Sequence, residues 1–428
     1  MKKEMKIGLL GLGVVATGVV ERLAAQKKQI EGQTGVKLTI SKALVLDTVE
    51  KAAFASAHGF ELTTKLEDIT ENTEIDIVIE LIGRISPAKE YILTALKNGK
   101  HVVTANKDLI AQHGQELIEV AKAQNVGFYY EASVGGGIPL LRPLATSYAA
   151  DTITSVKGIV NGTTNYMLTK MMEDQLDYQT ALEQAQNLGF AESDPTNDVD
   201  GIDAAYKMII LGAFAFGAEL KVTDLAIQGI RNVQAADVKV AQSLGYEVKL
   251  IGEVKQVGEG VTASVSPVLV AKNHPLAMIK NEYNGVFIES KGIGQSLLYG
   301  PGAGALPTAT SVLADLVEIA DRTQGKQDFA PFNRKVANAP LVNRENVKEN
   351  YFISVSLVTS AIETEEFVKG LVEQGYRVVY KAIDTKNNRL SLIVNHLTPT
   401  DYQTLLTKLA TQGMIQGQLG VMGDFNEN

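Results

Sequence analysis

Residues 6–18 read KIGLLGLGVVATG, in which a short apolar strand runs directly into a glycine-rich turn and then into a helix. The turn has the spacing G-x-G-x-x-A, with Gly11, Gly13 and Ala16 as its small residues. Such residues allow a tight turn and a close approach of the backbone to a pyrophosphate, which the N–H groups and dipole of the next helix attract. The alternative is a glycine turn without a ligand. The pattern favours a dinucleotide site made of Gly11, Leu12, Gly13, Val14, Val15 and Ala16.

Strand-like and helix-like segments alternate through the first 135 residues. Apolar runs such as KLTISKALVLD, IDIVIELIG, HVVTANKD and VGFYYEAS are separated by helical stretches such as SPAKEYILTALKNGK and LIAQHGQELIEVAKAQN. This rhythm is typical of β-α-β units. The sequence therefore predicts an α/β protein whose N-terminal part, 1–135, is a Rossmann-type, doubly wound parallel sheet.

The chain has 428 residues, which is too long for one ordinary domain. Residues 136–306 mix long helices with strands, and we expect an α+β domain for substrate binding and dimerisation. Residues 307–325 form an apolar-striped helix that we expect to return to the first domain. A polar, proline-containing linker is expected at 326–346. Residues 347–428 read β-α-β-β-α, as in a small ferredoxin-like unit.

Composition limits the classes of function. The net charge of −9 disfavours binding to the phosphate backbone of nucleic acids and to anionic lipid, and the sequence shows no basic patch that would offset it. We therefore expect neither a nucleic-acid nor a membrane partner. The chain has no cysteine, which excludes disulfides, thiolate nucleophiles and Cys-ligated metals. Four glycines interrupt the apolar N-terminus, so we interpret it as part of the fold rather than as a signal peptide. We expect a cytoplasmic protein.

Three further positions belong to the predicted cofactor site. Asp47 closes the second predicted strand, where an acidic residue usually binds the ribose hydroxyls of NAD, although it could equally cap the next helix. Leu46 beside it offers no charge to a 2′-phosphate. Thr104 and Lys107 follow at the carboxyl end of another strand, where ligands collect in such sheets. The alternative for Lys107 is a surface lysine in a loop.

The segment GFAESDPTNDVDGIDAAYKMIILGAFAFG, residues 189–217, is the strongest local signal for chemistry. Five acidic residues precede a helix that is apolar nearly all round and is therefore expected to be buried. Asp203 and Lys207 lie four apart on this helix, within pairing distance. A buried ion pair adds little net stability, so we interpret the lysine as a group that exchanges a proton with a carbonyl oxygen during hydride transfer. The alternative is a lysine whose stem lies on apolar surface.

Two more glycine-rich turns have weaker meanings. Glu131 and the turn SVGGGIP, residues 133–139, stand where the sheet passes to the second domain, and their carbonyl groups could hold an ion or ligand. Gly302 and Gly304 lie directly before a helix, where they could close over a cofactor or act as a hinge. The five histidines show no metal-ligand spacing.

Over residues 1 to about 330 the chain resembles the homoserine dehydrogenase family. The likeness rests on several long blocks in order: GLGVVATG, ELIGRISPAKEYILTALKNGKHVVTANK, EASVGGGIPL, GIVNGTTNYML, GFAESDPTNDVDGIDAAYK and YGPGAGALPTATSVLADLV. The resemblance implies reversible, NAD- or NADP-dependent reduction of L-aspartate 4-semialdehyde to L-homoserine, in threonine and methionine biosynthesis. It also implies a homodimer or homotetramer. Another amino-acid or semialdehyde dehydrogenase, or a sensor that binds NAD without turnover, is the competing interpretation.

The resemblance also implies roles for individual residues. Lys207 would be the proton donor and acceptor, and Lys107 would help to position the substrate carbonyl. The substrate amine would be held by Gly189, Glu192, Asp198 and Asp203. A monovalent cation, Na⁺ or K⁺, would be held mainly by the backbone oxygens of Glu131, Val134, Gly136 and Ile138.

The sequence departs from the family pattern in two places. Leu46 stands where many members have an arginine that contacts the phosphate of NADPH, so we do not expect a strong preference for NADP. The tail resembles an ACT regulatory domain in its element order, but LVTSAIETEE replaces the usual Asp-x-Pro-Gly after the first strand. Amino-acid feedback and dimerisation alone are therefore both open for the tail.

Overall fold

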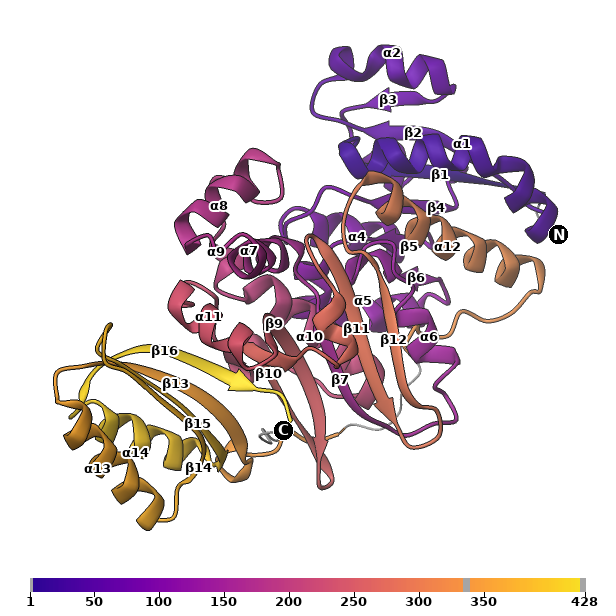
Figure 1. Ribbon diagram of the computed structural model, residues 1–428. Coiled ribbons are helices and arrows are strands. Elements are labelled where there is room, and N and C mark those ends of the chain that lie inside the picture. The colour runs from indigo at the N-terminus through magenta and orange to yellow at the C-terminus, as the bar shows by residue number, and fades with distance from the viewer. Residues whose placement is uncertain (1–2, 334–338, 424–428) are drawn as a thin grey trace. The chain divides into compact units, whose positions relative to one another are not determined.

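The computed structural model describes residues 3–333 and 339–423, which group into two compact units (Figure 1). Unit 1 comprises Met1–Ile153, Ile209–Lys221 and Leu298–Asn338, and unit 2 comprises Thr154–Met208, Val222–Leu297 and Ala339–Asn428. Part of the predicted linker, residues 334–338, lies outside the described residues. The C-terminal segment shares unit 2 with the middle of the chain, because β10 (Gly260–Ala271) pairs in parallel with β16 (Gly413–Val421).

Unit 1 is built on a six-stranded parallel sheet with the strand order β3-β2-β1-β4-β5-β6. The order reverses between β1 and β4, which is the topological switch point where such sheets bind ligands. The parallel α/β sheet predicted for the N-terminal part is confirmed. The strands are β1 (Glu4–Leu10), β2 (Lys37–Leu44), β3 (Glu61–Thr63), β4 (Ile77–Glu80), β5 (His101–Thr104) and β6 (Phe128–Tyr129).

Helices cover this sheet because its strands are apolar on both faces, and β4 is buried along its whole length. Gly18 of α1 lies so close to α12 that an added Cβ would be 2.8 Å from the carbonyl oxygen of Ala305. The helical elements are α1 (Val14–Thr34), α2 (Thr48–His58), α3 (Glu67–Thr70), α4 (Ala88–Lys97), α5 (Lys107–Ala123), η1 (Glu131–Ser133), α6 (Leu141–Thr146) and α12 (Ala305–Gln324). The helix predicted from Pro307 therefore begins two residues earlier.

The middle of the chain supplies several helices of unit 2 and several strands of one large sheet, whose order is β12-β11-β7-β9-β10-β16-β13-β15-β14, with β8 beside β10. Its elements here are β7 (Ile153–Ile159), α7 (Gly162–Glu173), α8 (Tyr178–Asn187), α9 (Thr196–Val199), η2 (Val222–Asp224), β8 (Ala226–Ile227), α11 (Ala235–Ser243), β9 (Tyr246–Val257), η3 (Pro275–Met278) and β11 (Tyr283–Ser290). Helix α10 (Ile202–Phe216) and strand β12 (Gly294–Pro301) each continue from unit 2 into unit 1.

The C-terminal segment reads β-α-β-β-α-β, one strand more than the sequence suggested. It consists of η4 (Arg344–Asn346), β13 (Glu349–Leu357), α13 (Ala361–Glu373), β14 (Arg377–Asp384), β15 (Arg389–Leu397), α14 (Pro399–Leu409) and β16. Both helices lie on one face of the sheet (Figure 1), and they bury a separate apolar core that includes Ile353, Leu371, Leu392 and Leu405. Strand β16 was missed because its sequence, GMIQGQLGV, contains three glycines.

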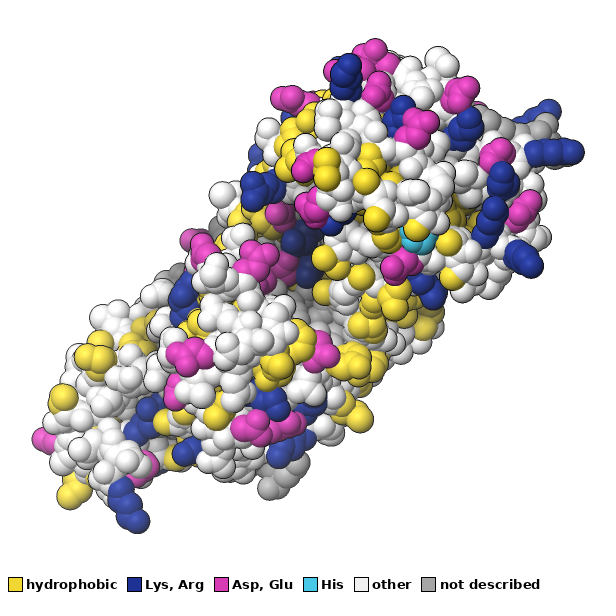
Figure 2. Space-filling model, turned by 90° about the horizontal axis from the view of Figure 1, so that it is seen from above, with side chains coloured by type: hydrophobic (Ala, Val, Ile, Leu, Met, Phe, Trp, Pro, Cys, Tyr) yellow, Lys and Arg dark blue, Asp and Glu magenta, His cyan; other side chains and the backbone are white. Residues whose placement is uncertain are grey.

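Charged side chains of both signs are interspersed over the face of the molecule shown in Figure 2. Ion pairs within unit 2 include Lys280 with Glu247 and Arg231 with Asp200. Among the described residues, no helix is both long and apolar enough to cross a membrane.

Lys249 on β9 is a fully buried lysine whose amine donates hydrogen bonds to Asn165 Oδ1 (3.1 Å) and to the carbonyl oxygen of Ile279. Burial lowers the pKa of Lys249 from 10.5 to about 7. Between these two values the unfolded chain holds a proton that the folded chain has lost, so stability rises with pH across that window and the penalty is complete below pH 7.

We expect Lys249→Met to remove this dependence. From pH 7 to pH 9 the free energy of unfolding of the wild type should rise by about 2 kcal/mol more than that of the variant, since one pH unit is worth at most about 1.4 kcal/mol. Urea unfolding at both pH values measures the difference. Equal pH dependence of the two proteins would show that Lys249 does not titrate in this range.

Candidate functional site

The glycine turn of unit 1 is open on the side where a ligand would lie. Gly11 has a φ of +93°, which only glycine adopts readily, and an added Cβ would lie 3.2 Å from Ile82 Cγ1. A Cβ at Gly13, the N-cap of α1, would meet nothing within 4 Å, and no side chain caps this helix. The first N–H groups of α1 therefore face an open space that suits a phosphate.

Asp47 caps helix α2 by accepting a hydrogen bond from the backbone N–H of Val49 (2.8 Å). The prediction that the second strand runs to Asp47 is wrong, because β2 ends at Leu44 and the chain then turns to begin this capped helix. Leu46 is fully exposed between the strand and the helix. The cap occupies one carboxylate oxygen of Asp47, and its contact with a ribose stays a prediction.

Thr104 and Lys107 lie at the carboxyl edge of the parallel sheet. Thr104 ends β5 and is fully buried, and its hydroxyl donates to Glu80 Oε2 (2.6 Å). Lys107 is the first residue of α5, and its amine lies 3.5 Å from Asp108 Oδ1. A cofactor contact of Thr104 therefore stays a prediction, whereas Lys107 is partly exposed at the edge where ligands bind in this fold.

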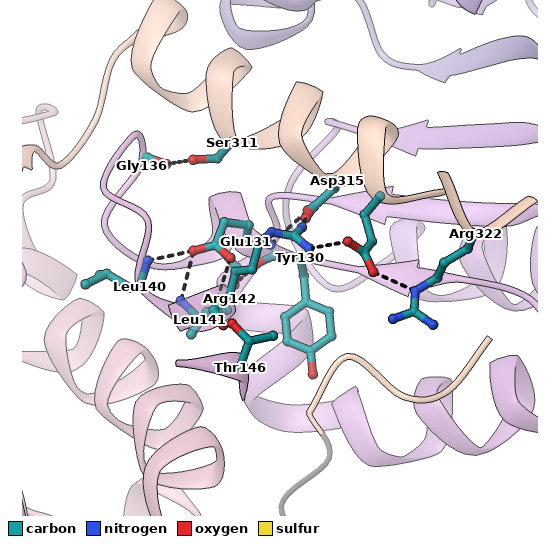
Figure 3. Close-up of polar contacts among 12 residues, drawn as sticks. Tyr130, Glu131, Gly136, Leu140, Leu141, Arg142, Thr146, Ser311, Asp315 and Arg322 are labelled. Carbon is teal, nitrogen blue, oxygen red and sulfur yellow. Dashed lines mark hydrogen bonds and ion pairs between the residues drawn. The ribbon is translucent and has the colours of Figure 1, made fainter. Parts of the chain in front are cut away.

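Glu131 is a buried carboxylate that stabilises the start of helix α6 (Figure 3). Its Oε1 accepts from the N–H groups of Leu140 (2.7 Å) and Leu141 (2.9 Å), and its Oε2 accepts from that of Arg142 (2.7 Å). Burial raises the pKa of Glu131, and these three hydrogen bonds oppose the rise. Its carboxylate is thus engaged within the protein, and its backbone carbonyl accepts a hydrogen bond from the N–H of Val134 (3.4 Å).

Helix α12 holds the turn that follows Glu131. Asp315 accepts from the N–H of Glu131 (3.0 Å) and from Arg142 Nη2 (2.6 Å), while Ser311 donates to the carbonyl oxygen of Gly136 (2.6 Å). Figure 3 shows these side chains converging on the turn. An added Cβ at Gly136 would lie 2.6 Å from the carbonyl oxygen of Gly302. The two glycine turns predicted to bind ligands, 133–139 and 302–304, therefore contact each other.

In unit 2, Lys207 and Asp203 of α10 form an ion pair of 2.8 Å in which both side chains are nearly buried. The amine of Lys207 also donates to the carbonyl oxygen of Val160 (2.6 Å). Asn161, the N-cap of α7, donates to Asp203 Oδ2 (2.9 Å) and Asp198 Oδ1 (2.7 Å). A fixed ammonium thus pairs with Asp203, and Asn161 joins Asp203 to the carboxylate of Asp198.

The structure changes the interpretation of the acidic segment in part. Asp203 belongs to the first turn of α10 and does not precede the helix, because α10 begins at Ile202. Asp200 pairs with Arg231 on the surface. Gly189, with a φ of +76°, and Glu192 lie on the exposed loop after α8. Among the residues that the structure describes, no three acidic or histidine side chains are grouped as metal ligands would be.

Sequence reasoning missed the residues that join the cluster together. Asn161 and Thr163 come from the start of α7, and Thr163 lies 3.5 Å from Asp198 Oδ2. The available signal was the segment GIVNGTTNYML, in which a buried strand ends directly at an asparagine that can cap a helix. The sequence alone could not show that Asn161 bonds to Asp203, because 42 positions separate the two residues.

Comparison with known proteins gives matches along most of the chain. Residues 11–131 match the family model described as the NAD binding domain of homoserine dehydrogenase, and residues 139–317 match the model described as homoserine dehydrogenase. The chain is 44% identical to the homoserine dehydrogenase of Lactococcus lactis over 91% of this chain and 94% of that protein. It is also 44% identical to that of Bacillus subtilis, over 74% and 73% of the two chains.

Solved structures agree with the sequence matches. A homoserine dehydrogenase from Thiobacillus denitrificans superposes with a TM-score of 0.92 at 31% identity, covering 98% of this chain and 99% of that one. The enzyme from S. aureus superposes with a TM-score of 0.81 at 32% identity, covering 99% and 100%. Sequence, family models and fold thus agree, and the chain belongs to the homoserine dehydrogenase family of NAD(P)-dependent oxidoreductases.

Proposed function

We propose that the chain interconverts L-aspartate 4-semialdehyde and L-homoserine, as a step of threonine and methionine biosynthesis. The observation that carries this proposal is the ammonium of Lys207 paired with Asp203, which Asn161 joins to Asp198. When bound, reduced NAD(P) supplies the hydride that adds to the carbonyl carbon of the semialdehyde. The carbonyl oxygen then takes a proton, and the product is the alcohol.

Lys207 is the proposed source of that proton. Asp203 and the carbonyl oxygen of Val160 fix its amine at 2.8 and 2.6 Å, so that the donor needs little reorganisation. In the reverse direction the same amine accepts the proton of the alcohol. Lys107 is proposed to position the carbonyl, and the substrate ammonium is proposed to be held by Gly189, Glu192, Asp198 and Asp203.

The residues of the glycine turn fit a dinucleotide, because the N-terminus of α1 has no side-chain cap and the space beside Gly13 is open. One solved relative, a hyperthermophilic archaeal homoserine dehydrogenase in complex with NADPH, is 26% identical with a TM-score of 0.63. The residues that we propose to hold the cofactor are Gly11, Leu12, Gly13, Val14, Val15, Ala16, Asp47, Thr104, Lys107, Gly302 and Gly304.

Leu46 leads to a prediction on cofactor choice. An exposed aliphatic side chain beside the ribose position cannot pair with a 2′-phosphate, so we expect kcat/KM for NADPH and NADH to differ by less than about 100-fold, which is near 2.7 kcal/mol. Leu46→Arg should shift the ratio toward NADPH by adding a charge-assisted contact. Steady-state kinetics with both cofactors give the ratio. A preference of the wild type for NADPH above 100-fold would contradict the prediction.

We also propose a monovalent cation site formed by the backbone oxygens of Glu131, Val134, Gly136 and Ile138. The donors fit a hard cation, because the buried turn offers oxygen ligands and the Glu131 carboxylate is already satisfied by three N–H groups. Ser311 bonds to the carbonyl oxygen of Gly136, which has a second lone pair for an ion. Thermal unfolding in K⁺, Na⁺ or tetramethylammonium chloride tests the site without reference to activity.

For the C-terminal segment we propose a ferredoxin-like module of the ACT type. Its element order β-α-β-β-α-β and its strand order β16-β13-β15-β14 support this assignment. Helix α13 begins with a capping box of Ser360 and Glu363 in place of the usual Asp-x-Pro-Gly turn. Amino-acid feedback and dimerisation are both open for this module, and the homodimer, the homotetramer and the cytoplasmic location stay predictions.

A single assay tests the proposed function. Purified protein is offered L-homoserine with NAD or NADP, and then a panel of other amino-acid alcohols and semialdehydes, while absorbance at the nicotinamide band is followed. Homoserine should give the highest kcat/KM of the panel. A higher value with another alcohol would point to a different dehydrogenase, and the absence of any absorbance change would favour a sensor that binds without turnover.

A further inference from the structure

Glu80 is a fully buried carboxylate at the end of β4, on the carboxyl edge of the parallel sheet in unit 1. In register it lies between Leu10 of β1 and Thr104 of β5. It therefore stands at the point where the strand order reverses.

The hydrogen bonds recorded for the Glu80 carboxylate come from uncharged donors. Oε1 accepts from the N–H groups of Ile82 (2.7 Å) and Gly83 (3.0 Å), and Oε2 accepts from the hydroxyl of Thr104 (2.6 Å). Burying a carboxylate costs free energy, whereas burying an apolar side chain of similar size does not. Stability alone thus does not explain a carboxylate at this position. The three hydrogen bonds that it accepts indicate that it holds neighbouring residues in place.

These bonds connect two loops at the edge of the sheet. The Thr104 hydroxyl donates its hydrogen to Glu80, and the oxygen of the same hydroxyl accepts a hydrogen bond from the N–H of Asn106 (3.0 Å). Asn106 in turn donates to the carbonyl oxygen of Arg84 (2.6 Å), and its Oδ1 accepts from the N–H of Leu109 in the first turn of α5 (3.2 Å). One network thus holds residues 81–84 and the start of the helix that carries Lys107.

The loop held by Glu80 contacts the glycine turn. An added Cβ at Gly11 would lie 3.2 Å from Ile82 Cγ1 and 3.4 Å from Ile82 N. The loop also contains Gly83 and Arg84, with φ values of +73° and +63°, and the second of these is unfavourable for a residue with a side chain. Fixed hydrogen bonds keep the loop in this conformation against Gly11.

We propose that Glu80 is a positioning residue for the nicotinamide cofactor. Through Thr104 and Asn106 it fixes the 81–84 loop against the glycine turn and fixes the N-terminus of α5 that presents Lys107. The inference rests on the proposed function only in its assignment of an NAD(P) site to this edge. It predicts that the network controls cofactor affinity rather than the stability of unit 1 alone.

The test compares variants by the dissociation constant for NADH, followed through the fluorescence of bound NADH, and by thermal unfolding. Glu80→Gln and Thr104→Val each break the network and should raise the dissociation constant about tenfold, or 1.4 kcal/mol. Thr104→Ser keeps the hydroxyl and should restore affinity to within about threefold of the wild type. The matched control is Thr70→Val, which removes a buried hydroxyl from α3 of the same unit, where it donates to the carbonyl oxygen of Leu66.

The control should lower the unfolding temperature without weakening NADH binding. If Glu80→Gln and Thr104→Val bind NADH as the wild type does, or if the control weakens binding equally, the positioning role is overturned. If Glu80→Gln does not fold, Asn106→Ala decides, because it removes the bonds to Arg84 and Leu109 at a residue that is not among the proposed cofactor contacts, and it should weaken NADH binding as Glu80→Gln would. Wild-type protein that binds NADH but does not oxidise homoserine would refute the proposed function and leave this test intact.

Discussion

Lys207→Ala is expected to lower turnover of homoserine about 10²- to 10⁴-fold, the usual contribution of a positioned acid–base group. The lysine is held by Asp203 and by the carbonyl oxygen of Val160, so its removal deletes the proton source and leaves Asp203 without this cation. The glycine turn belongs to the other unit, and NADH binding should persist. Steady-state kinetics and NADH titration of the same preparation measure both effects.

Two further variants make this test specific. Lys207→Arg keeps a positive charge, but a guanidinium does not release its proton at accessible pH, so turnover should stay low. Lys170→Ala removes a partly exposed lysine of α7 that pairs with Asp174 in an i,i+4 bridge and lies over the ring of Tyr166, and it should leave turnover unchanged. Near-native turnover of Lys207→Ala, or full activity of Lys207→Arg, would refute proton exchange by this residue.

Local sequence patterns predicted the features of the fold that depend on local structure. Each of these features is formed by residues that are close together in sequence: the turn at Gly11 and Gly13, the alternation of strands and helices, and the ion pair of Asp203 with Lys207. The structure confirms the parallel sheet and the pair. The end of β2 was misplaced because the cap formed by Asp47 competes with the strand, and a carboxylate gives both signals in sequence.

Contacts between distant segments could not be predicted in this way. Asn161 bonds to Asp203 across 42 positions, and Asp315 bonds to Glu131 across 184. Buried polar residues such as these are recognised only when their partners are known, because a lone acidic residue in an apolar helix reads equally as a surface residue. The same is true of Glu80, whose partners become apparent only when β4 and β5 pair.

Asp315→Ala is expected to lower the free energy of unfolding by about 3 kcal/mol, at the lower end of the range for breaking a buried pair. Asp315 is fully buried, and its loss leaves the buried N–H of Glu131 without its acceptor. Arg142 keeps Glu318 as a partner and lies over the rings of Tyr129 and Phe332, which limits the damage. Urea unfolding followed by circular dichroism measures the change.

The electrostatics of the site make the outcome informative. Burial raises the pKa of Asp315 and Arg142 opposes that rise, so the charge of the carboxylate depends on its partner. Asp315→Asn retains an acceptor for the N–H of Glu131 but not the charge, and its loss of stability should be intermediate. Asp321→Ala removes an exposed acid from the same helix and should change stability by less than about 0.5 kcal/mol. If Asp315→Ala lowers the free energy of unfolding no more than Asp321→Ala does, the buried pair of Asp315 and Arg142 does not stabilise the turn that follows Glu131.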